Sequence, residues 1–582
     1  MARSFTFLLK NRRIAEFCVL LLLTNLGPAL PLNAQTFFPL PAWFKDNVGR
    51  NQTYDQPRDA KDFLNSLIQD GKLRLTEADA VRLVLQNNLD VVVDLDDPRI
   101  AEYAILRGYG AFDPKLTGTL QIAGFQYPQS NVVTSGRVAY ESLQHIGNFS
   151  FSQLFPTGTR YSIDYTNTRS STNSLFDVVN PNIQSGFRAN ISQPLLKNFG
   201  MLVNKRPILI ARNNKDISDY VFAERLIALV NQAQGLYWDT VFAREDIKVK
   251  QRSLDLATKI HEDNKRQVEI GTMAPIDLVK SESEIANRRE ELIVAQFTLE
   301  QYENTIRKVI SSQRDPGQIP SKIEPLDNTL SPNDFKDFDL AQAVSYAIEA
   351  RPEIKQYKKD LENQEINRRY YRNQLLPTVN LNLTYGTNAL AGQSRLLLPD
   401  GSFIYGPRTG FWDNLNDLFT NRFQTYVASV SVEIPIKNRS AQADYAQAML
   451  SKSQSEKKLR ALEQQIALEV RNAHTDLEMN RARIDATKKA RELAERNLDA
   501  EQKKFQLGTS TIRFVLEEQR NLAAALTNEV KALTDFTKSK ANLDRAIGKT
   551  LEVQNIKVED ALAPAHQSPD KATVPQGAPN GK

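Results

Sequence analysis

Two segments of the chain carry apolar residues at the spacing of a very long helix. In residues 205–270, and again in residues 440–507, apolar side chains recur at steps of three and four positions, which is typical of a helix with one apolar stripe. The stripes consist of Leu226, Val230, Ala233, Tyr237 and Val241 in the first segment and of Leu459, Leu462, Ile466, Val470, Ala473 and Leu477 in the second. A helix of about 65 residues would be on the order of 100 Å long, at about 1.5 Å per residue. The same steps suit coiled-coil packing, so we expect a second helix beside each.

Each long helical segment stops at a glycine inside sequence that otherwise favours helix. Gly271 and Thr272 follow the first segment, and Gly508 and Thr509 follow the second, 237 positions later (508 − 271). A lone glycine inside a helix costs about 1 kcal/mol relative to alanine, and here it recurs with the same flanking pattern. We therefore predict a chain reversal at each glycine. The return helices are expected at 274–310 and 511–547.

Other landmarks repeat as well. LTEADAVRLVLQNNLD, which starts at Leu75, aligns without gaps with FDLAQAVSYAIEARPE, which starts at Phe338, and SQPLLKN at 192–198 matches EIPIKN at 433–438. The chain is thus an internal duplication. Each half has two short helices, then a proline and strand-like sequence, then the helical hairpin. The short helices are expected at 76–88 and 97–112 in the first half and at 339–350 and 353–375 in the second.

The strand-like stretches alternate apolar and polar residues and are rich in aromatic and β-branched side chains, which is typical of strands. They lie at 116–127, 145–155, 159–168, 183–195, 378–386 and 423–436. Several have the length of a tilted membrane strand, about 9–11 residues. We count two membrane strands per half, although the first half offers more strand-like segments than this count uses.

The N-terminal residues read as a secretory signal. Basic residues precede an apolar run at 14–26, and Leu32-Asn33-Ala34 is a suitable cleavage site. The single cysteine, Cys18, lies inside the apolar run and lacks the preceding small residues of a lipid-modified cysteine. No second apolar stretch has the length of about 18 residues that a membrane helix needs. If the exported chain enters a membrane, it must do so as a closed β-barrel.

Charge and motifs exclude several function classes. The chain has 74 Lys and Arg against 69 Asp and Glu, a net charge of +5, and this near balance indicates solvated helix faces. We expect no nucleic-acid binding, because no basic cluster with a readable motif is present. The four histidines stand outside metal-binding motifs, and no phosphate-binding loop or nucleophile motif occurs. We expect no enzyme activity, no catalytic residue, no cofactor and no metal site.

These observations divide the chain into six parts. They are a signal peptide (1–34), an N-terminal extension (35–72), a first repeat (73–311, strands within 116–195, tip at 271), a proline-rich linker (312–337), a second repeat (338–550, strands within 378–436, tip at 508) and a C-terminal tail (551–582). The tail is rich in Pro, Ala, Gly and Gln, which indicates disorder at its end.

The order, spacing and duplication of these features resemble the TolC-type outer-membrane efflux proteins over roughly residues 73–550. The residues that carry the resemblance are Ala101–Pro114 with its partner ending at Leu376-Pro377, SQPLLKN, LYWDTVFARED (236–246), EIGTMAPIDLVKSESEI (269–285) and FQLGTSTIRFVLEEQ (505–519). The resemblance implies a mainly α fold with membrane β: a homotrimer in which four strands per chain close a twelve-stranded outer-membrane β-barrel. Twelve helices would close a periplasmic α-barrel, with the linker as a belt around its middle. A four-stranded sheet leaves edges that lipid cannot satisfy, which also favours closure by copies of the chain.

The same resemblance assigns roles to the hairpin tips. Gly271, Thr272, Gly508 and Thr509 become candidates for contact with a periplasmic adaptor protein; alternatively, the glycines only make the turn. In the protein that gives the family its name, carboxylates six and nine residues after the second tip glycine form rings at the aperture. The corresponding residues here are Phe514 and Glu517. Three Phe514 rings would make an apolar constriction that gates by dewetting, with a weaker charge ring at Glu517. Alternatively, Phe514 packs in the wall, and Arg513 pairs with Glu517 four residues later.

The resemblance implies a passive exit duct of a tripartite efflux pump in the outer membrane of a Gram-negative-type bacterium. An inner-membrane pump of the RND or ABC type would act through the adaptor. One alternative is the outer-membrane component of type I protein secretion, and another is a duplicated membrane chain that is permanently closed. A rival from a different class is a periplasmic coiled-coil scaffold, which would leave the alternating segments at 378–386 and 423–436 without a role.

Overall fold

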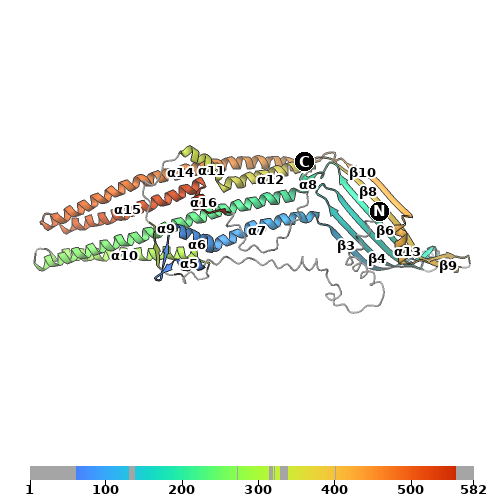
Figure 1. The fold of residues 1–582 in the computed structure, drawn as a ribbon, viewed down its shortest axis with the longest axis horizontal. Coiled ribbons are helices and arrows are strands. Elements are labelled where there is room, and N and C mark those ends of the chain that lie inside the picture. Colours follow the sequence, from blue (N-terminus) through green and yellow to red (C-terminus); the bar gives the residue numbers. More distant parts are fainter. Residues whose placement is uncertain are drawn as a thin grey trace. The chain divides into compact units, whose positions relative to one another are not determined.

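The computed structural model describes residues 61–129, 138–271, 273–312, 319, 322–327, 339–399 and 401–558. The predicted signal peptide, most of the N-terminal extension, most of the linker and most of the C-terminal tail lie outside the described residues. All described residues belong to one compact unit, Pro57–Ala563, and they are drawn in colour in Figure 1.

Two helical hairpins dominate this unit (Figure 1). The first consists of α9 (Arg206–Glu269) and α10 (Pro275–Ile310), and the second of α14 (Arg439–Gln506) and α15 (Ile512–Ile547). The shorter helices are α5 (Lys61–Ser66), α6 (Glu77–Asn87), α7 (Leu89–Tyr109), η1 (Gly110–Phe112), α8 (Met201–Asn204), α11 (Leu340–Ala350), α12 (Pro352–Gln374), α13 (Phe411–Phe419) and α16 (Thr550–Val553).

One short helix differs from its expected bounds. A helix was expected from about residue 97, next to Pro98, yet α7 starts at Leu89. Its start is set by Asn88, whose side-chain oxygen accepts a hydrogen bond from the Asp90 N–H at 2.7 Å, which is the usual role of asparagine at a helix N-terminus. Pro98 therefore lies inside the helix instead of at its first turn.

The helices form a layer of four parallel tracks. The helix α9 packs against α10 and α7 on one side and against α15 and α12 on the other, and α14 packs against α15 and α12. The order across the layer is therefore α10 with α7, then α9, then α15 with α12, then α14 (Figure 1). The outer tracks are the two edges of the layer. One contains α7, which leads to the first strand of the main sheet, and the other is α14, which follows its last strand.

Two apolar cores hold the layer together. One lies under the small sheet of β1 (Ile68–Gln69), β2 (Lys72–Leu75) and β7 (Lys322–Pro325) and contains Leu75, Leu83, Tyr237, Trp238 and Ile310. The other joins the helices of the second repeat and contains Ile354, Ile466, Val470, Leu477 and Phe536. From the predicted apolar stripes, Ala233, Tyr237 and Val241 lie in the first core, and all six residues of the second stripe lie in or against the second core. Leu226 and Val230 are also buried, which explains the helical spacing of both stripes.

The main sheet runs through both repeats. Its strands are β3 (Lys115–Pro128), β4 (Ala139–Leu154), β5 (Arg160–Thr172), β6 (Val179–Pro194), β8 (Thr378–Leu397) and β10 (Phe423–Glu433). They are hydrogen-bonded in the order β10-β8-β6-β5-β4-β3, and β9 (Phe403–Arg408) pairs with β8 off this path. All neighbours are antiparallel.

The strand count corrects the expectation of two membrane strands per half and four per chain. The first half contributes four strands to the path and the second half contributes two. Alternation marks each strand in the sequence, but whether a strand joins the sheet depends on its pairing, and pairing is not visible along the chain. The hairpin of β4 and β5 pairs on both sides and is part of the sheet.

Candidate functional site

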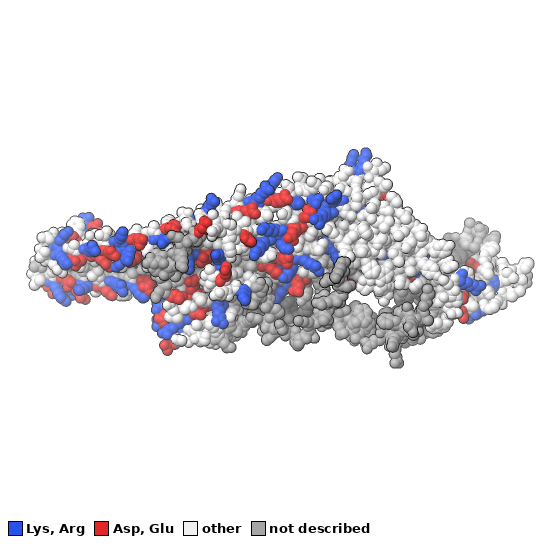
Figure 2. All heavy atoms as spheres, turned by 45° about the horizontal axis from the view of Figure 1, so that its top comes forward, with Lys and Arg blue, Asp and Glu red and all other residues white. Residues whose placement is uncertain are grey.

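The register gives the sheet one apolar face. A single row of directly opposed residues crosses all six strands, and it consists of Leu116, Phe151, Ile163, Ala189, Tyr385 and Tyr426. Opposed residues share a face, so we call the side of this row the apolar face. The charged residues of the apolar face, such as Glu141 and Arg169, lie towards the strand ends that are remote from the helices. Figure 2 shows few charged side chains over the sheet and many over the helices. This is the surface that lipid requires of a membrane strand.

The opposite side of the sheet is polar. Its matching row consists of Thr117, Ser150, Asp164, Arg188, Gly386 and Thr425, and we call this side the polar face. The Asp164 carboxylate accepts hydrogen bonds from Ser150, from Ser162 at 2.9 Å and from Asn190 at 2.8 Å. Thr384 in turn donates to the Asn190 side chain at 2.9 Å. One network therefore runs from β4 to β8, and it lines a hollow of about 540 Å³.

A short helix adds aromatic residues at one end of the apolar face. The helix α13 packs on β8 and β6, and its Asn414 side chain donates to the Ile183 carbonyl at 2.8 Å. Beside it, Ala389 and Ala391 of β8, which share the parity of Tyr385, are buried. The outward residues Trp412 and Phe419 stay exposed. Aromatic side chains of this kind are typical of membrane–water interfaces.

The hairpin tips are glycine turns. Gly508 has φ +73°, its N–H donates to the Phe505 carbonyl at 3.0 Å, and the Thr509 N–H donates to the Lys504 carbonyl at 2.9 Å. This pair of bonds is the Schellman ending, which requires a left-handed residue and favours glycine. Gly271 has φ +78° and donates to the Val268 carbonyl at 3.0 Å. Thr272 lies outside the described residues.

Replacing Gly508 by alanine is expected to lower the free energy of unfolding by about 1–2 kcal/mol, the cost of a left-handed conformation for an L-residue. A new Cβ would meet no atom within 4 Å, so the effect comes from the backbone alone. Thermal unfolding of the detergent-extracted protein measures it. The control is Gly235→Ala, inside α9 and with equally open surroundings, which should stabilise by about 0.5–1 kcal/mol. Equal shifts of the same sign in both variants would contradict the explanation.

The two tips lie against each other. Leu498, Ile512, Val515 and Leu516 of the second hairpin form a small core, and Leu256, Ile260 and Met273 of the first hairpin pack against it. Gly271 and Gly508 are both exposed beyond this core. The structure therefore brings the two turns into one region, although they are far apart in sequence.

The three predicted aperture residues share the outer surface of α15. Ile512, Val515 and Leu516 face the core between the hairpins, which leaves Arg513, Phe514 and Glu517 exposed. The Phe514 side chain is 50% exposed. Within the described residues no hydrogen bond or ion pair joins Arg513 to Glu517, so the alternative in which these two are paired does not describe this structure.

Sequence reasoning missed a buried ion cluster behind the tips. Glu284 of α10 is 2% exposed, and it accepts hydrogen bonds from Arg288 at 2.7 and 2.9 Å and from Arg520 of α15. Arg288 also bonds Glu291 at 3.0 Å. The spacing of four residues between Glu284 and Arg288 hinted at a pair on one helix, but nothing along the chain pointed to Arg520. The cluster joins the two hairpins.

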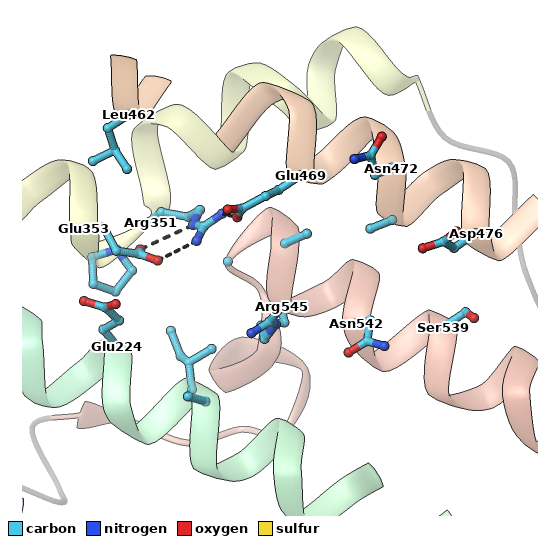
Figure 3. A pocket seen from close by; sticks show the side chains of 16 residues that line it. Glu224, Arg351, Glu353, Leu462, Glu469, Asn472, Asp476, Ser539, Asn542 and Arg545 are labelled. Carbon is cyan, nitrogen blue, oxygen red and sulfur yellow. Dashed lines mark hydrogen bonds and ion pairs between the residues drawn. The ribbon is translucent and has the colours of Figure 1, made fainter. Parts of the chain in front are cut away.

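A second ion cluster lies between the repeats (Figure 3). Arg351, at the start of α12, donates to Glu353 and, at 2.6 Å, to Glu469 of α14. These groups and Glu224 of α9 line a cavity of about 590 Å³. Burial raises the pKa of Glu224, and the nearby carboxylate of Glu353 adds to that rise. Burial also acts to raise the pKa of Glu469, but the hydrogen bonds, with that from Arg351 foremost, outweigh it and the pKa is lowered. The Arg351 guanidinium thus ties α12 to α14.

Neither a membrane-spanning helix nor a metal-binding cluster occurs in the described part of the chain. No helix there is both long enough and apolar enough to cross a membrane. The same residues contain no group of three His, Cys, Asp or Glu side chains placed to hold a metal ion.

Comparison with known proteins agrees with this architecture. Residues 343–549 match the family model described as outer membrane efflux protein. No curated protein matches the chain. Among solved structures, the chain is similar to the Campylobacter jejuni CmeC outer membrane channel, with a TM-score of 0.56 and 14% identity over 83% of this chain and 87% of that one.

Two further solved structures share the fold. The outer membrane protein VceC from Vibrio cholerae matches with a TM-score of 0.56 and 14% identity, over 81% of this chain and 95% of that one. The Neisseria gonorrhoeae MtrE outer membrane channel in its open state matches with a TM-score of 0.54 and 16% identity, over 82% of this chain and 89% of that one. The second repeat thus matches the outer membrane efflux protein family, and both repeats together share the fold of TolC-type outer membrane channels.

Proposed function

We propose that three copies of this chain form a continuous duct that crosses the outer membrane and extends into the periplasm. The observation that carries the proposal is the sheet, which has one mainly apolar face, one face with a polar network, and two unpaired edges. An open edge exposes backbone groups that lipid cannot satisfy. Copies of the chain can pair these edges, which would turn the apolar face to lipid and the polar face to water.

The helical layer supports head-to-tail closure. Along α7, the apolar residues Leu89, Val93, Ile100 and Tyr103 lie on one side, and each is at least 49% exposed. On the opposite edge of the layer, Met449, Leu450, Leu468, Met479 and Leu493 of α14 are exposed. Exposed apolar seams mark surfaces that another chain covers. Because the two seams differ, contact between them is heterologous and closes into a ring when the rotation fits.

The duct would act as the passive exit of a tripartite efflux pump. The energy and the choice of cargo would come from an inner-membrane pump that acts through a periplasmic adaptor. Gly271, Thr272, Gly508 and Thr509 are the proposed adaptor contact, because Gly271, Gly508 and Thr509 are exposed and both turns lie in one region at the free end of the hairpins. Three copies would present six such turns to the adaptor.

Native mass and membrane location of the protein after extraction with mild detergent test the duct. A trimer recovered from the outer-membrane fraction is the expected result. A monomer or dimer released without detergent would mean that the strands do not close a barrel, and a periplasmic scaffold would then describe the chain better.

Within the duct, we propose a mainly apolar gate. The tips would converge, and Phe514 and Glu517 of each copy would face the axis, because both point away from the core between the hairpins. Three exposed Phe514 rings would narrow the aperture and exclude water. Three Glu517 carboxylates would form a weaker ring of charge beside them, and like charges close together resist simultaneous ionisation.

Replacing Phe514 by alanine is expected to raise the single-channel conductance in planar bilayers, because the change removes the apolar constriction. The control is Phe297→Ala in α10, an equally exposed phenylalanine far along the hairpin from the tip, which should leave the conductance unchanged. If Phe514 packs in the wall instead, its replacement will lower the thermal stability and leave the conductance at the wild-type value.

A further inference from the structure

We infer that three copies of this chain close a barrel of eighteen strands (3 × 6), and that β10 of each copy pairs with β3 of the next. The inference rests on the trimer proposed above and concerns the number of strands in its wall. It follows from the six-stranded path of the sheet, in which β3 and β10 each have a neighbour on one side only.

Strand direction allows this junction. The strand β3 follows α7 and η1 and so leaves the helical layer, whereas β10 leads into α14 and so returns to it. The strands between them alternate in direction, because every pair in the path is antiparallel. With six strands per copy, β10 of one copy runs opposite to β3 of the next. The ring therefore closes with antiparallel pairs throughout, as in bacterial outer-membrane barrels.

The two edges of the helical layer are continuous in sequence with the two edge strands of the sheet. The helices α7 and α10 form one outer track of the helical layer, and α14 forms the other. Since α7 continues towards β3 and α14 follows β10, the same rotation that joins the two helical edges also brings the two strand edges together. One interface between copies would therefore cover the exposed apolar seams and also pair the two edge strands.

The hairpin of β4 and β5 belongs to the wall and is not an appendage. The strand β3 reaches β6 only through β4 and β5, and the apolar row crosses both through Phe151 and Ile163. Their connecting turn is packed tightly, because a Cβ on Gly158 would lie 2.6 Å from the Asn198 carbonyl oxygen. The Gln153 side chain also donates to the Phe112 carbonyl at 3.0 Å. These contacts fix the hairpin to the segments that join sheet and helices.

The extra strands widen the exit. Barrel diameter grows roughly linearly with strand number, so eighteen strands give about 1.5 times the diameter of twelve. With strands about 4.8 Å apart and tilted by about 40°, the backbone diameter is about 36 Å for eighteen strands and about 24 Å for twelve. Barrels of 16–18 strands leave an aqueous channel. The polar face, with Asp164 and Arg188 from each copy, would line this channel.

End-on cryo-electron microscopy of the detergent-extracted, full-length protein measures the diameter directly. Trimers with a barrel about 36 Å across are expected from the strand spacing and tilt. Trimers with a barrel about 24 Å across would overturn the eighteen-strand wall but leave the proposed duct intact. Particles that are not trimers would overturn both. Because the unmodified chain is used, this measurement does not depend on how any variant folds.

Disulfide cross-linking tests the junction between copies. Cys18, in the predicted signal peptide, is the only native cysteine, so introduced pairs have no background. Thr117→Cys on β3 is combined in turn with Thr425→Cys, Ser429→Cys or Ser431→Cys on β10, all on the polar face. Oxidation is expected to give covalent trimers for at least one pair. The control pair, Thr117→Cys with Ser162→Cys on β5, should give none. Trimers that no β3–β10 pair can cross-link, or that the control pair cross-links equally well, would overturn the junction.

Discussion

Replacing Glu284 by alanine is expected to lower the free energy of unfolding by about 3–5 kcal/mol, the usual cost of removing one partner from a buried ion pair. The Arg288 side chain is only 7% exposed, and the change leaves its charge buried with Glu291 as its remaining carboxylate. It also releases Arg520, which joins the second hairpin to the first. Thermal and denaturant unfolding of the extracted protein measure the loss. The variant should unfold first near the tips.

The matched control is Glu291→Ala. The Glu291 side chain is 39% exposed and pairs with Arg288 and Lys250, and partly exposed pairs of this kind are worth about 1 kcal/mol or less. If both variants lose the same stability, burial of the Glu284 carboxylate is not what makes the cluster important.

The same carboxylate predicts a pH dependence. Burial alone would raise the pKa of Glu284, but the hydrogen bonds from Arg520 and Arg288 outweigh burial and hold the pKa below its ordinary value of 4.5. A group whose folded-state pKa is depressed stabilises the fold above its unfolded pKa, and this stabilisation is lost as the pH falls through the folded value. The stability difference between the wild type and Glu284→Gln should therefore be constant from pH 6 to 8, which lies above both values, and should shrink in acid below about pH 4.5. A difference that does not change in acid would contradict this.

The long helices could be predicted because their signal is local. The predicted segments 205–270 and 440–507 correspond to α9 and α14, since a long apolar stripe and a terminal glycine are both visible along the chain. The start of α7 could not be placed in the same way. The helix was expected at 97–112, but the cap at Asn88 starts it at Leu89, and proline inside a helix, as at Pro98, is the rarer case.

The strand count depends on contacts that sequence does not show. Alternation identified residues 145–155 and 159–168 as strand-like, but a hairpin outside the wall and a hairpin within it alternate alike. What decides is that β4 pairs with β3 and that β5 pairs with β6. The count of two membrane strands per half therefore omitted segments that the pattern of the residues had already marked as strand-like, and the described sheet includes them.

The candidate sites also divide into those that are visible along the chain and those that depend on long-range contacts. The turns at Gly271 and Gly508 follow from two residues each, and their geometry agrees with the prediction of a chain reversal. The cluster around Glu284 needs Arg520, which lies 236 residues away in sequence. The polar network needs the Asn190 side chain of β6 to reach the Asp164 carboxylate of β5. Long-range polar contacts of this kind have no periodicity, so they can be found only once the fold is known.

Replacing Val430 by arginine is expected to destabilise the membrane-inserted protein by about 2–4 kcal/mol, the cost of a basic residue on the lipid-facing side near the middle of a barrel strand. Val430 is 60% exposed in the single chain and is opposed to Leu381 on β8, so it belongs to the apolar face. Unfolding by urea from lipid vesicles measures the loss, together with the yield of folded trimer in the outer membrane.

The neighbouring residue supplies the control. Ser429 is opposed to Asn382 and lies on the polar face, because successive side chains of a strand point to opposite sides. An arginine at Ser429 would face water in the duct, where substitutions change ion selectivity more than stability. Ser429→Arg should therefore insert and fold like the wild type while Val430→Arg fails. If Ser429→Arg is the damaging change, the sheet is inside out with respect to lipid. Equal tolerance of both changes would mean that neither face meets lipid, and the proposed duct would lose the observation on which it rests.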